Sequence, residues 1–517
     1  FAEPELRFFR SRQLAGEGRA DEAVAILTAL EAGGGAEHLV HTWPGVLELY
    51  RSGVRSGRLS AAASVLEAIG RAEPALAAVA LEYAGRLYRL AGAYTPAISL
   101  LGESLSLLSP GADEQRLRWY LLSSRVRRDP VGTAEALAAE VPALEEPAYY
   151  SDLFVELAGL LAERQAWEPM LTAYGAIADF AAAGALARYE LALARALETG
   201  RLYAAPARAA ELRERYLRRA LGQRENRFAA IMAGALLGED AVDVLEIAED
   251  SGGSSDAGVP ADAARSENRA TAGDQPADEE SAWSLLAHTY ERFALFDELV
   301  GVLRRTVDGV TPEFRLRSAG RLARAGRIRE SVLVLSSLER AGGSLTTEAA
   351  RLRYPLAYAA VVDGRVDAEQ IDRATFYALL REESLFDPEI SSRAGAVGLA
   401  QLIPSTAADI ARRMRLEEPV LTDPADNVTI GARYFSMLTE QFGTMARALA
   451  AYNGGQGNVR RWERDAGALD EVLFHQAIPF PETYNHVRKV VVSASFYGYL
   501  YAGRAPAETA RRIFALE

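Results

Sequence analysis

The sequence predicts an all-α protein in which an array of helical hairpins precedes a smaller α-rich domain. Three observations support this fold class. Apolar residues return every three or four positions from residue 1 to about residue 250, as they do in amphipathic helices. A turn that contains glycine recurs along the same half of the chain. After about residue 366 the chain becomes richer in Gly, Tyr and Asn within apolar surroundings, which is typical of a binding site.

The composition is that of a folded, soluble protein with more than one domain. A chain of 517 residues is longer than one core usually supports, and 49% hydrophobic with 25% charged residues is ordinary for globular proteins. The net charge of −14 argues against a nucleic-acid partner. Cysteine is absent, so disulfides and thiolate metal sites are excluded. No apolar run approaches the roughly 20 residues of a membrane-spanning helix.

The N-terminal half carries a degenerate phrase in which a glycine ends one helix and a small residue lets the next helix pack closely. We expect these glycines to adopt the left-handed conformation and the helices to form stacked hairpins. The spacing is irregular and lacks the aromatic landmarks of a strict tetratricopeptide array, so an irregular helical array is the alternative. The glycines are Gly18, Gly57, Gly92 and Gly200, and the phrase returns after residue 280 at Gly326.

The pattern divides the chain into four predicted segments. Residues 1–250 form a TPR-like, superhelical solenoid of helical hairpins. Residues 251–280 contain hardly any large apolar side chain and are expected to be a disordered insertion, because burial cannot offset their ordering entropy. Helical periodicity resumes in residues 281–365, which continue the solenoid. Residues 366–517 form the C-terminal domain.

The first chemical motif of this domain is a glutamate at the end of a helix. Ile371–Ser384 reads as an amphipathic helix, and Pro388 disfavours its continuation. Glu383 then lies in the last turn, at the negative end of the helix dipole, with Leu385 and Phe386 as apolar neighbours. Both effects favour the protonated acid, which could donate a proton near pH 7.

Further short segments follow along this domain. Ser391–Gln401 is rich in glycine and small residues and predicts a small β-hairpin that a polymer can approach closely. Pro404 marks a helix start, and Asp423-Pro424 opens a helix that reaches about Phe442. Two later segments, a Tyr/Asn/Gly turn after a helix and a Pro-rich start of an aromatic C-terminal helix, are residues 451–455 and 478–487.

In order and spacing these segments resemble the catalytic domain of soluble (periplasmic) peptidoglycan lytic transglycosylases, which is goose-lysozyme-like in fold. The resemblance covers roughly residues 372–503, and the helical array is similar to the superhelical domain upstream in periplasmic members. The motifs that carry it are Glu383-Ser384, Gly398-Leu399-Ala400-Gln401, Ala451-Tyr452-Asn453-Gly454-Gly455 and Pro479-Phe480-Pro481-Glu482-Thr483.

The resemblance implies cleavage of the β-1,4 bond between N-acetylmuramic acid and N-acetylglucosamine in peptidoglycan glycan strands. Carried over to Glu383, the family's single glutamate first protonates the leaving oxygen and then removes a proton from the muramoyl C6 hydroxyl. The product carries a 1,6-anhydro ring. No second carboxylate is required, unlike in an ordinary glycosidase. It also implies an exported, periplasmic protein, whose signal peptide is not in the given chain, and cell-wall proteins as partners of the helical repeats.

The same carry-over supplies the substrate-binding residues and two departures from the family's pattern. The family usually has methionine where this chain has Ala400, and arginine and tyrosine where it has Tyr484 and His486. An imidazole, or Tyr484 from another angle, would therefore replace a phenol beside the glutamate. The residues expected to bind substrate are Ser392, Gln401, Ile403, Tyr452, Asn453, Tyr484 and His486.

Alternative readings accompany these expectations. Glu382 is interpreted as a solvated helix-end glutamate, and Asp387, which precedes a proline, as a turn residue. The histidines lie in no ligand-like spacing, so we expect no metal and no cofactor. Two rival functions remain: a hydrolytic muramidase of the same fold, and a catalytically impaired scaffold that binds proteins through its helical repeats.

Overall fold

The computed structural model describes residues 43–248 and 282–516, except 73, 109–111, 306–309, 341–344 and 468, together with a few isolated residues between 10 and 29. The chain divides into two compact units. Unit 1 comprises residues 1–216 and 465–479, and unit 2 comprises residues 217–464 and 480–517. The predicted insertion at 251–280 lies outside the described residues, and the predicted domain boundaries stay predictions.

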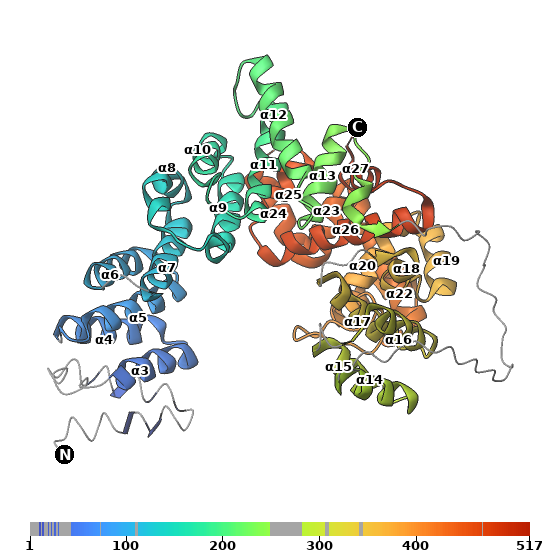
Figure 1. Cartoon of the computed structure of the whole chain (residues 1–517), viewed down its shortest axis with the longest axis horizontal. Coiled ribbons are helices and arrows are strands. Elements are labelled where there is room, and N and C mark those ends of the chain that lie inside the picture. Colours follow the sequence, from blue (N-terminus) through green and yellow to red (C-terminus); the bar gives the residue numbers. More distant parts are fainter. Residues whose placement is uncertain are drawn as a thin grey trace. The chain divides into compact units, whose positions relative to one another are not determined.

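Unit 1 consists of helices that follow one another along the chain (Figure 1). Short 3-10 turns at Val141–Ala143 and Pro147–Tyr150 join two of them. The helix α12 runs across the boundary into unit 2. The helices are α3 (Trp43–Ser56), α4 (Leu59–Ala72), α5 (Ala77–Leu90), α6 (Tyr94–Leu107), α7 (Ala112–Arg128), α8 (Pro130–Glu140), α9 (Ser151–Glu163), α10 (Trp167–Ile177), α11 (Ala183–Glu198), α12 (Pro206–Leu221) and α25 (Glu471–Gln476).

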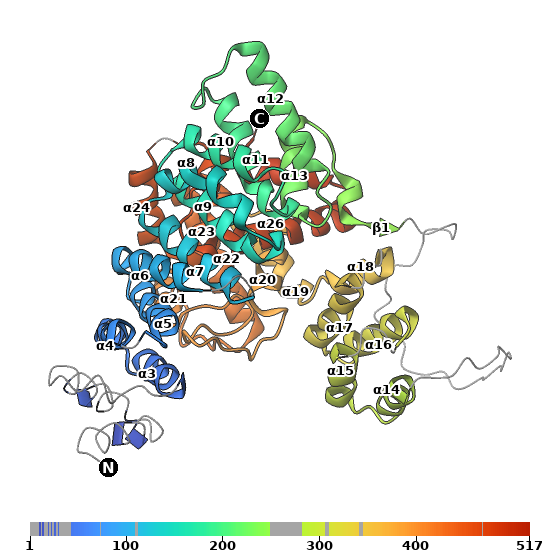
Figure 2. The same cartoon turned by 60° about the vertical axis from the view of Figure 1, so that its left-hand side comes forward.

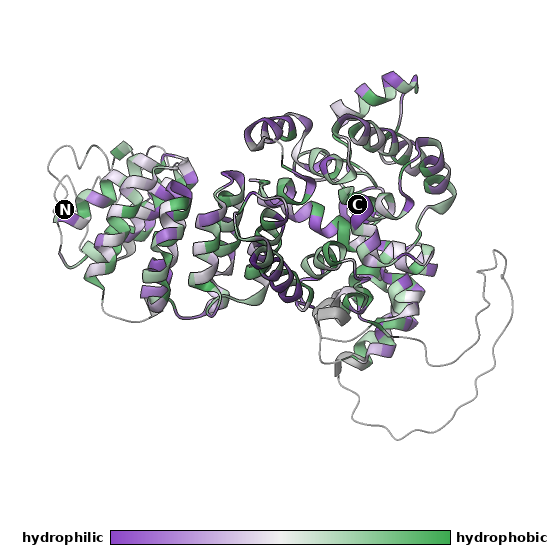
Figure 3. Ribbon diagram, turned by 90° about the horizontal axis from the view of Figure 1, so that it is seen from above, coloured by the Kyte–Doolittle hydropathy of each residue, from purple (hydrophilic) through white to green (hydrophobic). Residues whose placement is uncertain are grey.

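The glycine turns and close helix contacts predicted for this half are confirmed where the structure describes them. A Cβ on Gly53 of α3 would lie 2.6 Å from Ala62 of α4, so the two backbones approach closely only because both residues are small. Figure 3 shows hydrophobic and hydrophilic residues alternating along most described helices, as amphipathic packing requires. Positive φ angles, from 70° to 76°, occur at Gly57, Gly92 and Gly200 of unit 1 and at Gly326 of unit 2, while Gly18 lies outside the described residues.

A buried arginine joins the late segment 465–479 to the hairpins of unit 1. Arg188 of α11 is only 7% exposed and donates hydrogen bonds to the carbonyls of Val155 (3.0 Å), Gln476 (2.5 Å) and Ile478 (3.4 Å). A Cβ on Gly159 would lie 2.6 Å from its guanidinium, so glycine is needed there. Arg188 therefore satisfies carbonyls that burial would otherwise leave unpaired.

Unit 2 contains the remaining elements. Figure 2 shows α14 to α17 as one group of helices. A two-residue parallel pairing joins β1 (Ile247–Ala248) to β2 (Leu345–Thr346), and a 3-10 turn spans Val242–Leu245. The helices are α13 (Arg227–Leu237), α14 (Ala282–Arg292), α15 (Phe296–Arg305), α16 (Pro312–Arg324), α17 (Ile328–Arg340), α18 (Thr347–Arg353), α19 (Ala359–Glu369), α20 (Arg373–Ser384), α21 (Pro404–Met414), α22 (Pro424–Phe442), α23 (Met445–Gly454), α24 (Gln456–Ala466), α26 (Pro481–Ala502) and α27 (Pro506–Phe514).

The predicted all-α fold class is confirmed, and several predicted helix ends agree with the structure. The helices α21 and α22 begin at Pro404 and Pro424, and α23 ends at Gly454. The predicted hairpin is present in reduced form, as antiparallel bridges from Val397 to Ser391 and to Leu402. The helix predicted from residue 371 begins at residue 373, because the Asp372 side chain caps it. No helix among the described residues is long and apolar enough to span a membrane.

The contacts of Arg188 predict the effect of removing its guanidinium. Arg188→Met should lower the free energy of unfolding by about 2–4 kcal/mol, because the carbonyls of Gln476 and Ile478 would lose their donor in a buried place. Chemical denaturation measures this difference. Arg164→Met is the matched control, because Arg164 is 43% exposed in its side chain. Equal stability of the two variants would show that Arg188 does not hold the segment.

Candidate active site

The predicted acid, Glu383, is fixed by the last turn of α20. The Oδ2 of Asp372 accepts a hydrogen bond from the Thr375 amide at 2.9 Å and so starts this helix. Leu385 ends it in the left-handed conformation, with φ of 51°. Along its length α20 packs against α26, the helix that carries His486 and Ser493. The acid therefore stands on a rigid element rather than a loop.

The side chain of Glu383 is largely buried, at 15% exposure. Burial, chiefly, raises the pKa of Glu383 to about 8, and the negative charges of Glu382 and Glu482 raise it further. Phe386, one of the apolar neighbours expected from the sequence, is buried at 2% exposure. At neutral pH the group is therefore an uncharged acid that can give up a proton.

Glu382 is not the solvated glutamate that the sequence suggested. Its Oε1 accepts hydrogen bonds from the Arg381 guanidinium and from the Ser493 hydroxyl, the latter at 2.5 Å. Arg381 also donates to the Arg353 carbonyl at 3.2 Å and lies over the Tyr354 ring. Burial acts to raise the pKa of Glu382, but the charge of Arg381 and the hydrogen bond from Ser493 outweigh it, and the pKa is lowered. The interpretation failed because Ser493, which binds Glu382 together with the adjacent Arg381, comes from a distant part of the chain. Glu382 is therefore a fixed negative charge next to Glu383.

His486 lies beside the acid. Its Nε2 is 3.6 Å from the Glu383 Oε1, and its side chain is 9% exposed. Burial lowers the pKa of His486 to about 4. Among the described residues no hydrogen bond satisfies this nitrogen. Between pH 4 and pH 8 both groups are therefore uncharged, and their contact is not an ion pair.

The loop opposite α22 is held by a residue that the sequence did not single out, Asn427. Its Oδ1 accepts from the Ala400 amide at 2.7 Å, and its Nδ2 donates to the carbonyls of Val397 (3.0 Å) and Leu421 (2.8 Å). A Cβ on Gly398, whose φ is 80°, would lie 2.3 Å from this amide. The glycine of the motif is thus required by close packing, and an asparagine inside a helix gave no local signal of this role.

Three predicted binding residues lie on or next to this loop. The Nε2 of Gln401 donates to the carbonyls of Ile390 (3.1 Å) and Gly398 (3.0 Å), so the amide nitrogen folds the loop. Ser392 is exposed, and its hydroxyl accepts from the Ala396 amide at 3.1 Å. Ile403, at 39% exposure, precedes α21 and presents an apolar side chain to solvent.

Tyr452 and Asn453 connect α23 to its surroundings. The Tyr452 hydroxyl donates to the Ala400 carbonyl at 2.7 Å. Burial, chiefly, raises the pKa of Tyr452 well above its ordinary value, and the neighbouring Glu383 contributes to the rise. The Oδ1 of Asn453 accepts from the Thr483 hydroxyl at 2.8 Å. These contacts tie the Tyr/Asn/Gly turn to both the glycine-rich loop and α26.

Tyr484 occupies a different place from His486. It is buried at 4% exposure, and the Arg488 guanidinium lies 5.4 Å from the centre of its ring. Of the two positions where this chain departs from the family pattern, His486 therefore supplies the side chain beside the acid. The role of both residues in binding substrate stays a prediction.

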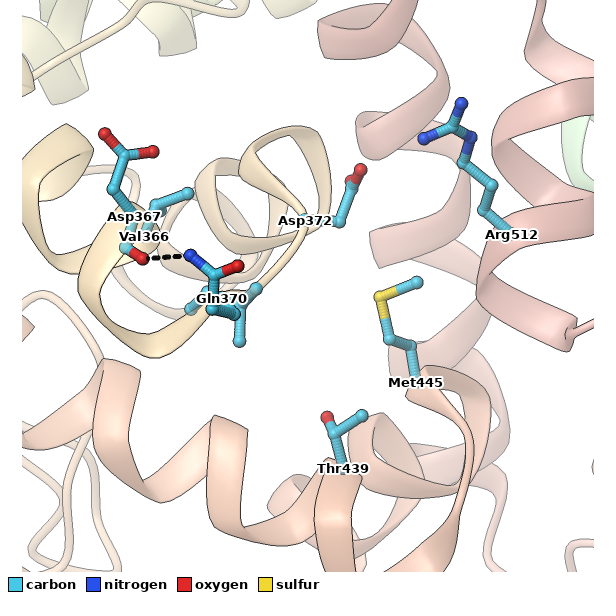
Figure 4. Close-up of a pocket in the computed structure, with 8 residues that line it drawn as sticks. Val366, Asp367, Gln370, Asp372, Thr439, Met445 and Arg512 are labelled. Carbon is cyan, nitrogen blue, oxygen red and sulfur yellow. Dashed lines mark hydrogen bonds between the residues drawn. The ribbon is translucent and has the colours of Figure 1, made fainter.

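A cavity of about 630 Å³ in unit 2 is formed by other residues (Figure 4). Asp372 lines it and is bound to Arg504 at 2.8 Å, while Arg512 is bound to Glu508 at 2.9 Å. None of the predicted site residues lines this cavity. The described residues also contain no group of three or more His, Cys, Asp or Glu placed to hold a metal ion.

A known domain family matches the part of the chain that carries the acid, the glycine-rich loop and the Tyr/Asn turn. Residues 361–474 match the family model described as Transglycosylase SLT domain. This part of the chain is therefore similar to transglycosylase SLT domains. The SLT domain includes α20 with Glu383, the loop that Asn427 holds, and the turn at Tyr452; the side chain of His486 comes from α26, which follows the matched residues.

Similar proteins agree with the SLT domain. The chain is 35% identical over 153 residues to the soluble lytic murein transglycosylase of Escherichia coli (strain K12), a match that covers 28% of this chain and 24% of that protein. It is 34% identical over 98 residues to membrane-bound lytic murein transglycosylase F of Pseudomonas putida (strain W619), covering 18% of this chain and 19% of that one. The soluble relative is therefore matched over about a quarter of its length.

A solved structure extends the likeness of fold beyond the SLT domain. An inactive mutant of lytic transglycosylase Slt from Pseudomonas aeruginosa superposes with a TM-score of 0.51 and 20% sequence identity. The match covers 98% of this chain and 82% of that chain. The helical units that accompany the SLT domain therefore share their fold with that protein.

The raised pKa of Glu383 predicts a pH-dependent gain of stability in Glu383→Gln. Between pH 4.5 and 8 the folded state keeps a proton that the unfolded state has lost, so the free energy of unfolding of the native protein falls as pH rises. The glutamine of the variant does not titrate, so its free energy of unfolding does not fall in this way. Compared with the native protein, the variant should be more stable by about 1–3 kcal/mol at pH 7 and hardly more stable at pH 4. Denaturant unfolding at both pH values measures the difference.

The control for this measurement is Glu508→Gln, because Glu508 is a surface residue with a side chain that is 43% exposed. Its effect should not grow between pH 4 and pH 7. If Glu383→Gln also changed stability by the same amount at both pH values, the Glu383 carboxyl would not be protonated in the folded protein at pH 7.

Proposed function

We propose that this protein is a peptidoglycan lytic transglycosylase that cleaves the β-1,4 bond between N-acetylmuramic acid and N-acetylglucosamine. The observation that carries this proposal is a single buried carboxyl group, that of Glu383, with its pKa raised to about 8 in an SLT domain. Such a group is a proton donor at neutral pH. The substrate class is supported by the names of the relatives, which are murein transglycosylases.

In the first half of the reaction Glu383 gives its proton to the glycosidic oxygen, and the bond from that oxygen to C1 of the muramoyl sugar breaks. In the second half the Glu383 carboxylate takes the proton of the C6 hydroxyl, and the C6 oxygen forms a bond to C1. The product is a 1,6-anhydro sugar, no water is consumed, and Glu383 is protonated again. One carboxyl group thus serves both steps.

The neighbours of Glu383 suit both its protonated and its ionised form. Glu382 adds a fixed negative charge that helps to keep Glu383 protonated before the first step. The neutral imidazole of His486, 3.6 Å away, can hydrogen-bond to the Glu383 carboxylate after that step. We assign contacts with the sugar to six further residues: Ser392, Gln401, Ile403, Tyr452, Asn453 and Tyr484.

The proposal includes an exported, periplasmic location, where the substrate is found, and partners among cell-wall proteins that bind the helical repeats. Hydrolysis by the same acid is the second candidate. It is favoured only if the site admits a water molecule in place of the C6 hydroxyl. A scaffold without activity is the third candidate, and its support is the departure from the family pattern at Tyr484 and His486.

Digestion of purified peptidoglycan tests the proposal. The native protein should release fragments with anhydro ends, whose mass is one water less than that of hydrolysed fragments. Glu383→Gln should lose at least about a hundredfold in rate, since it removes the only proton donor of the mechanism. Mass spectrometry and a turbidity assay measure the two results.

Glu440→Gln is the control for this assay, because Glu440 lies on α22 with a side chain that is 69% exposed. It should digest at the native rate. Fragments with hydrolysed ends would identify a muramidase, and a native protein that releases nothing would identify a scaffold.

The pH profile tests the role of Glu382. In the native protein the rate should fall as pH rises through about 8, where Glu383 loses its proton. Glu382→Gln removes a negative charge and leaves the positive charge of Arg381 near the site, so the Glu383 pKa should fall and this alkaline limb should move to lower pH. Initial rates between pH 5 and pH 9.5, a window of about four units around the Glu383 pKa, measure the movement.

Glu482→Gln provides the comparison, because Glu482 also raises the Glu383 pKa but is exposed to solvent. Because water screens the charge of Glu482, the alkaline limb of the pH profile should move less in Glu482→Gln than in Glu382→Gln. An unchanged limb in Glu382→Gln would contradict the electrostatic role, even if the rate at its optimum were reduced.

A further inference from the structure

The guanidinium of Arg381 is held from several directions in the interior of unit 2. Its side chain is only 5% exposed. The Nε donates to the Arg353 carbonyl at 3.2 Å, and one terminal nitrogen donates to the Ser493 hydroxyl at 3.3 Å and to the Glu382 carboxylate. Because the N–H groups of a guanidinium point outward in its plane, these hydrogen bonds occupy its edge. They leave its two faces to other neighbours.

One face of this guanidinium is covered by the ring of Tyr354. The central carbon of the Arg381 guanidinium lies 4.4 Å from the ring centre, and Tyr354 is 3% exposed. The face of an aromatic ring carries negative potential and attracts a cation, most strongly where both groups are shielded from water. Arg353 lies farther from the centre of the same ring, at 5.7 Å. The ring therefore acts chiefly on Arg381.

The Tyr354 ring is itself held in place by α26. It stacks on Phe496, with 4.1 Å between the ring centres and 9° between the ring planes. The Tyr501 hydroxyl donates to the Tyr354 carbonyl at 2.9 Å, and the Tyr497 hydroxyl donates to the Pro355 carbonyl at 3.0 Å. Because the stacked ring and the guanidinium both lie close to one ring centre, they occupy its opposite faces. The ring is thus a supported surface for the cation.

These neighbours lie outside the residues that match the family model. The match covers residues 361–474 and so includes both glutamates. Arg353 and Tyr354 precede it, and Ser493 follows it. The position of Arg381 therefore depends on parts of the chain on either side of the matched residues.

Close packing alone does not fix Arg381, because its side chain borders a cavity of about 1050 Å³. Tyr354, Glu382 and Ser493 line the same cavity. A long arginine side chain next to a cavity has other rotamers within reach, and each of them would place the positive charge elsewhere. The hydrogen bonds at the edge of the guanidinium and the ring on its face select one orientation.

The orientation of Arg381 matters for the acid. If the guanidinium turned into the cavity, the buried Glu382 would lose its counter-charge and take up a proton, and it would no longer raise the pKa of Glu383. If the guanidinium turned toward Glu383, its charge would favour the carboxylate directly. Both movements lower the Glu383 pKa and weaken the proton donor.

Other charged and titratable groups near the two glutamates come from α18, α23 and α26. Glu482 helps to raise the pKa of Glu383, and Arg353 helps to lower the pKa of Glu382. A substitution that changes only the ring of Tyr354 leaves these groups in the chain, so a shift in the Glu383 pKa reports the movement of a charge. Further groups are Tyr452, His486 and Lys489.

We propose that Tyr354 is a positioning residue of the active site, whose ring fixes the Arg381 guanidinium on Glu382 and so holds the two adjacent glutamates in opposite protonation states. This role requires the negative face of the ring and not only its volume. The inference rests on the proposed function where activity is measured, but the protonation of Glu383 is also measurable through stability alone.

Three changes at position 354 test the proposal through the pH profile of peptidoglycan digestion by the full chain. Tyr354→Phe keeps the ring face, so its alkaline limb should stay at the native pH. Tyr354→Leu removes the ring, and its limb should move to lower pH by at least about half a unit. A phenylalanine with three fluorine atoms on its ring keeps the shape of Tyr354→Phe but withdraws electrons from the ring face. Its limb should lie between those of the other two variants.

Unfolding by denaturant gives the same information without any activity. The stability that Glu383→Gln adds grows with pH and reaches a plateau above the pKa of Glu383 in the folded state. In the Tyr354→Leu background the plateau should begin at least about half a unit lower in pH, and in the Tyr354→Phe background it should begin where it does in the native protein. If Tyr354→Leu does not fold, the fluorinated variant supplies the comparison with Tyr354→Phe.

Tyr189→Leu is the matched control, because Tyr189 is a fully buried ring of α11 in unit 1. It should destabilise the protein but leave the pH of the limb and of the plateau unchanged. A native limb and plateau in Tyr354→Leu, or a fluorinated variant that equals Tyr354→Phe, would overturn the proposal. So would a Tyr354→Phe that moves as far as Tyr354→Leu, because the hydroxyl would then be responsible.

The two measurements separate this inference from the proposed function. If the protein digests no peptidoglycan but its plateau moves with the ring at position 354, the proposed function fails and the role of Tyr354 stands. If it digests peptidoglycan with a limb that does not respond to the ring, the role of Tyr354 fails and the proposed function stands.

Discussion

The site depends on one constraint: the carboxyl group of Glu383 must stay buried without being neutralised by a cation. A buried carboxyl next to a free guanidinium would ionise and would no longer donate a proton. Here the nearby guanidinium of Arg381 binds Glu382 instead, on the same helix turn. The pair therefore presents to Glu383 a negative neighbour, which acts in the same direction as burial. Two adjacent glutamates thus take opposite protonation states because one has charged and hydroxyl partners and the other has an apolar surround.

The rest of unit 2 keeps this environment in place. The packing of α20 against α26 brings Ser493 and His486 to the two glutamates from a position more than a hundred residues later in the chain. On the other side, Asn427 and Tyr452 fix the backbone of the glycine-rich loop through Ala400. The loop needs glycine at position 398 because the asparagine amide fills the place of a side chain. Rigid support of this kind is what a group with a displaced pKa requires.

The sequence predicted well what depends on local patterns. Helix periodicity, prolines at helix starts and glycine turns located many elements of the described fold, and the end of α20 placed Glu383 in its last turn. It could not predict contacts made by residues distant in the chain. The interpretation of Glu382 as solvated was wrong because Ser493 and Arg353 are not its neighbours in sequence. Asn427 was missed because a polar residue within a helix carries no sign of the loop that it holds.

The imidazole beside the acid illustrates why a neutral partner suits a group that must work in both protonation states. A permanently charged arginine in the place of His486 would stabilise the carboxylate at all times and lower the Glu383 pKa. A neutral imidazole exerts little such pull on the protonated acid, yet its N–H can donate to the carboxylate once the proton has left. Burial enforces this neutrality, because it holds the pKa of His486 near 4. The same burial that keeps Glu383 protonated therefore also keeps its partner uncharged, so that one physical cause sets both groups for the two halves of the proposed reaction.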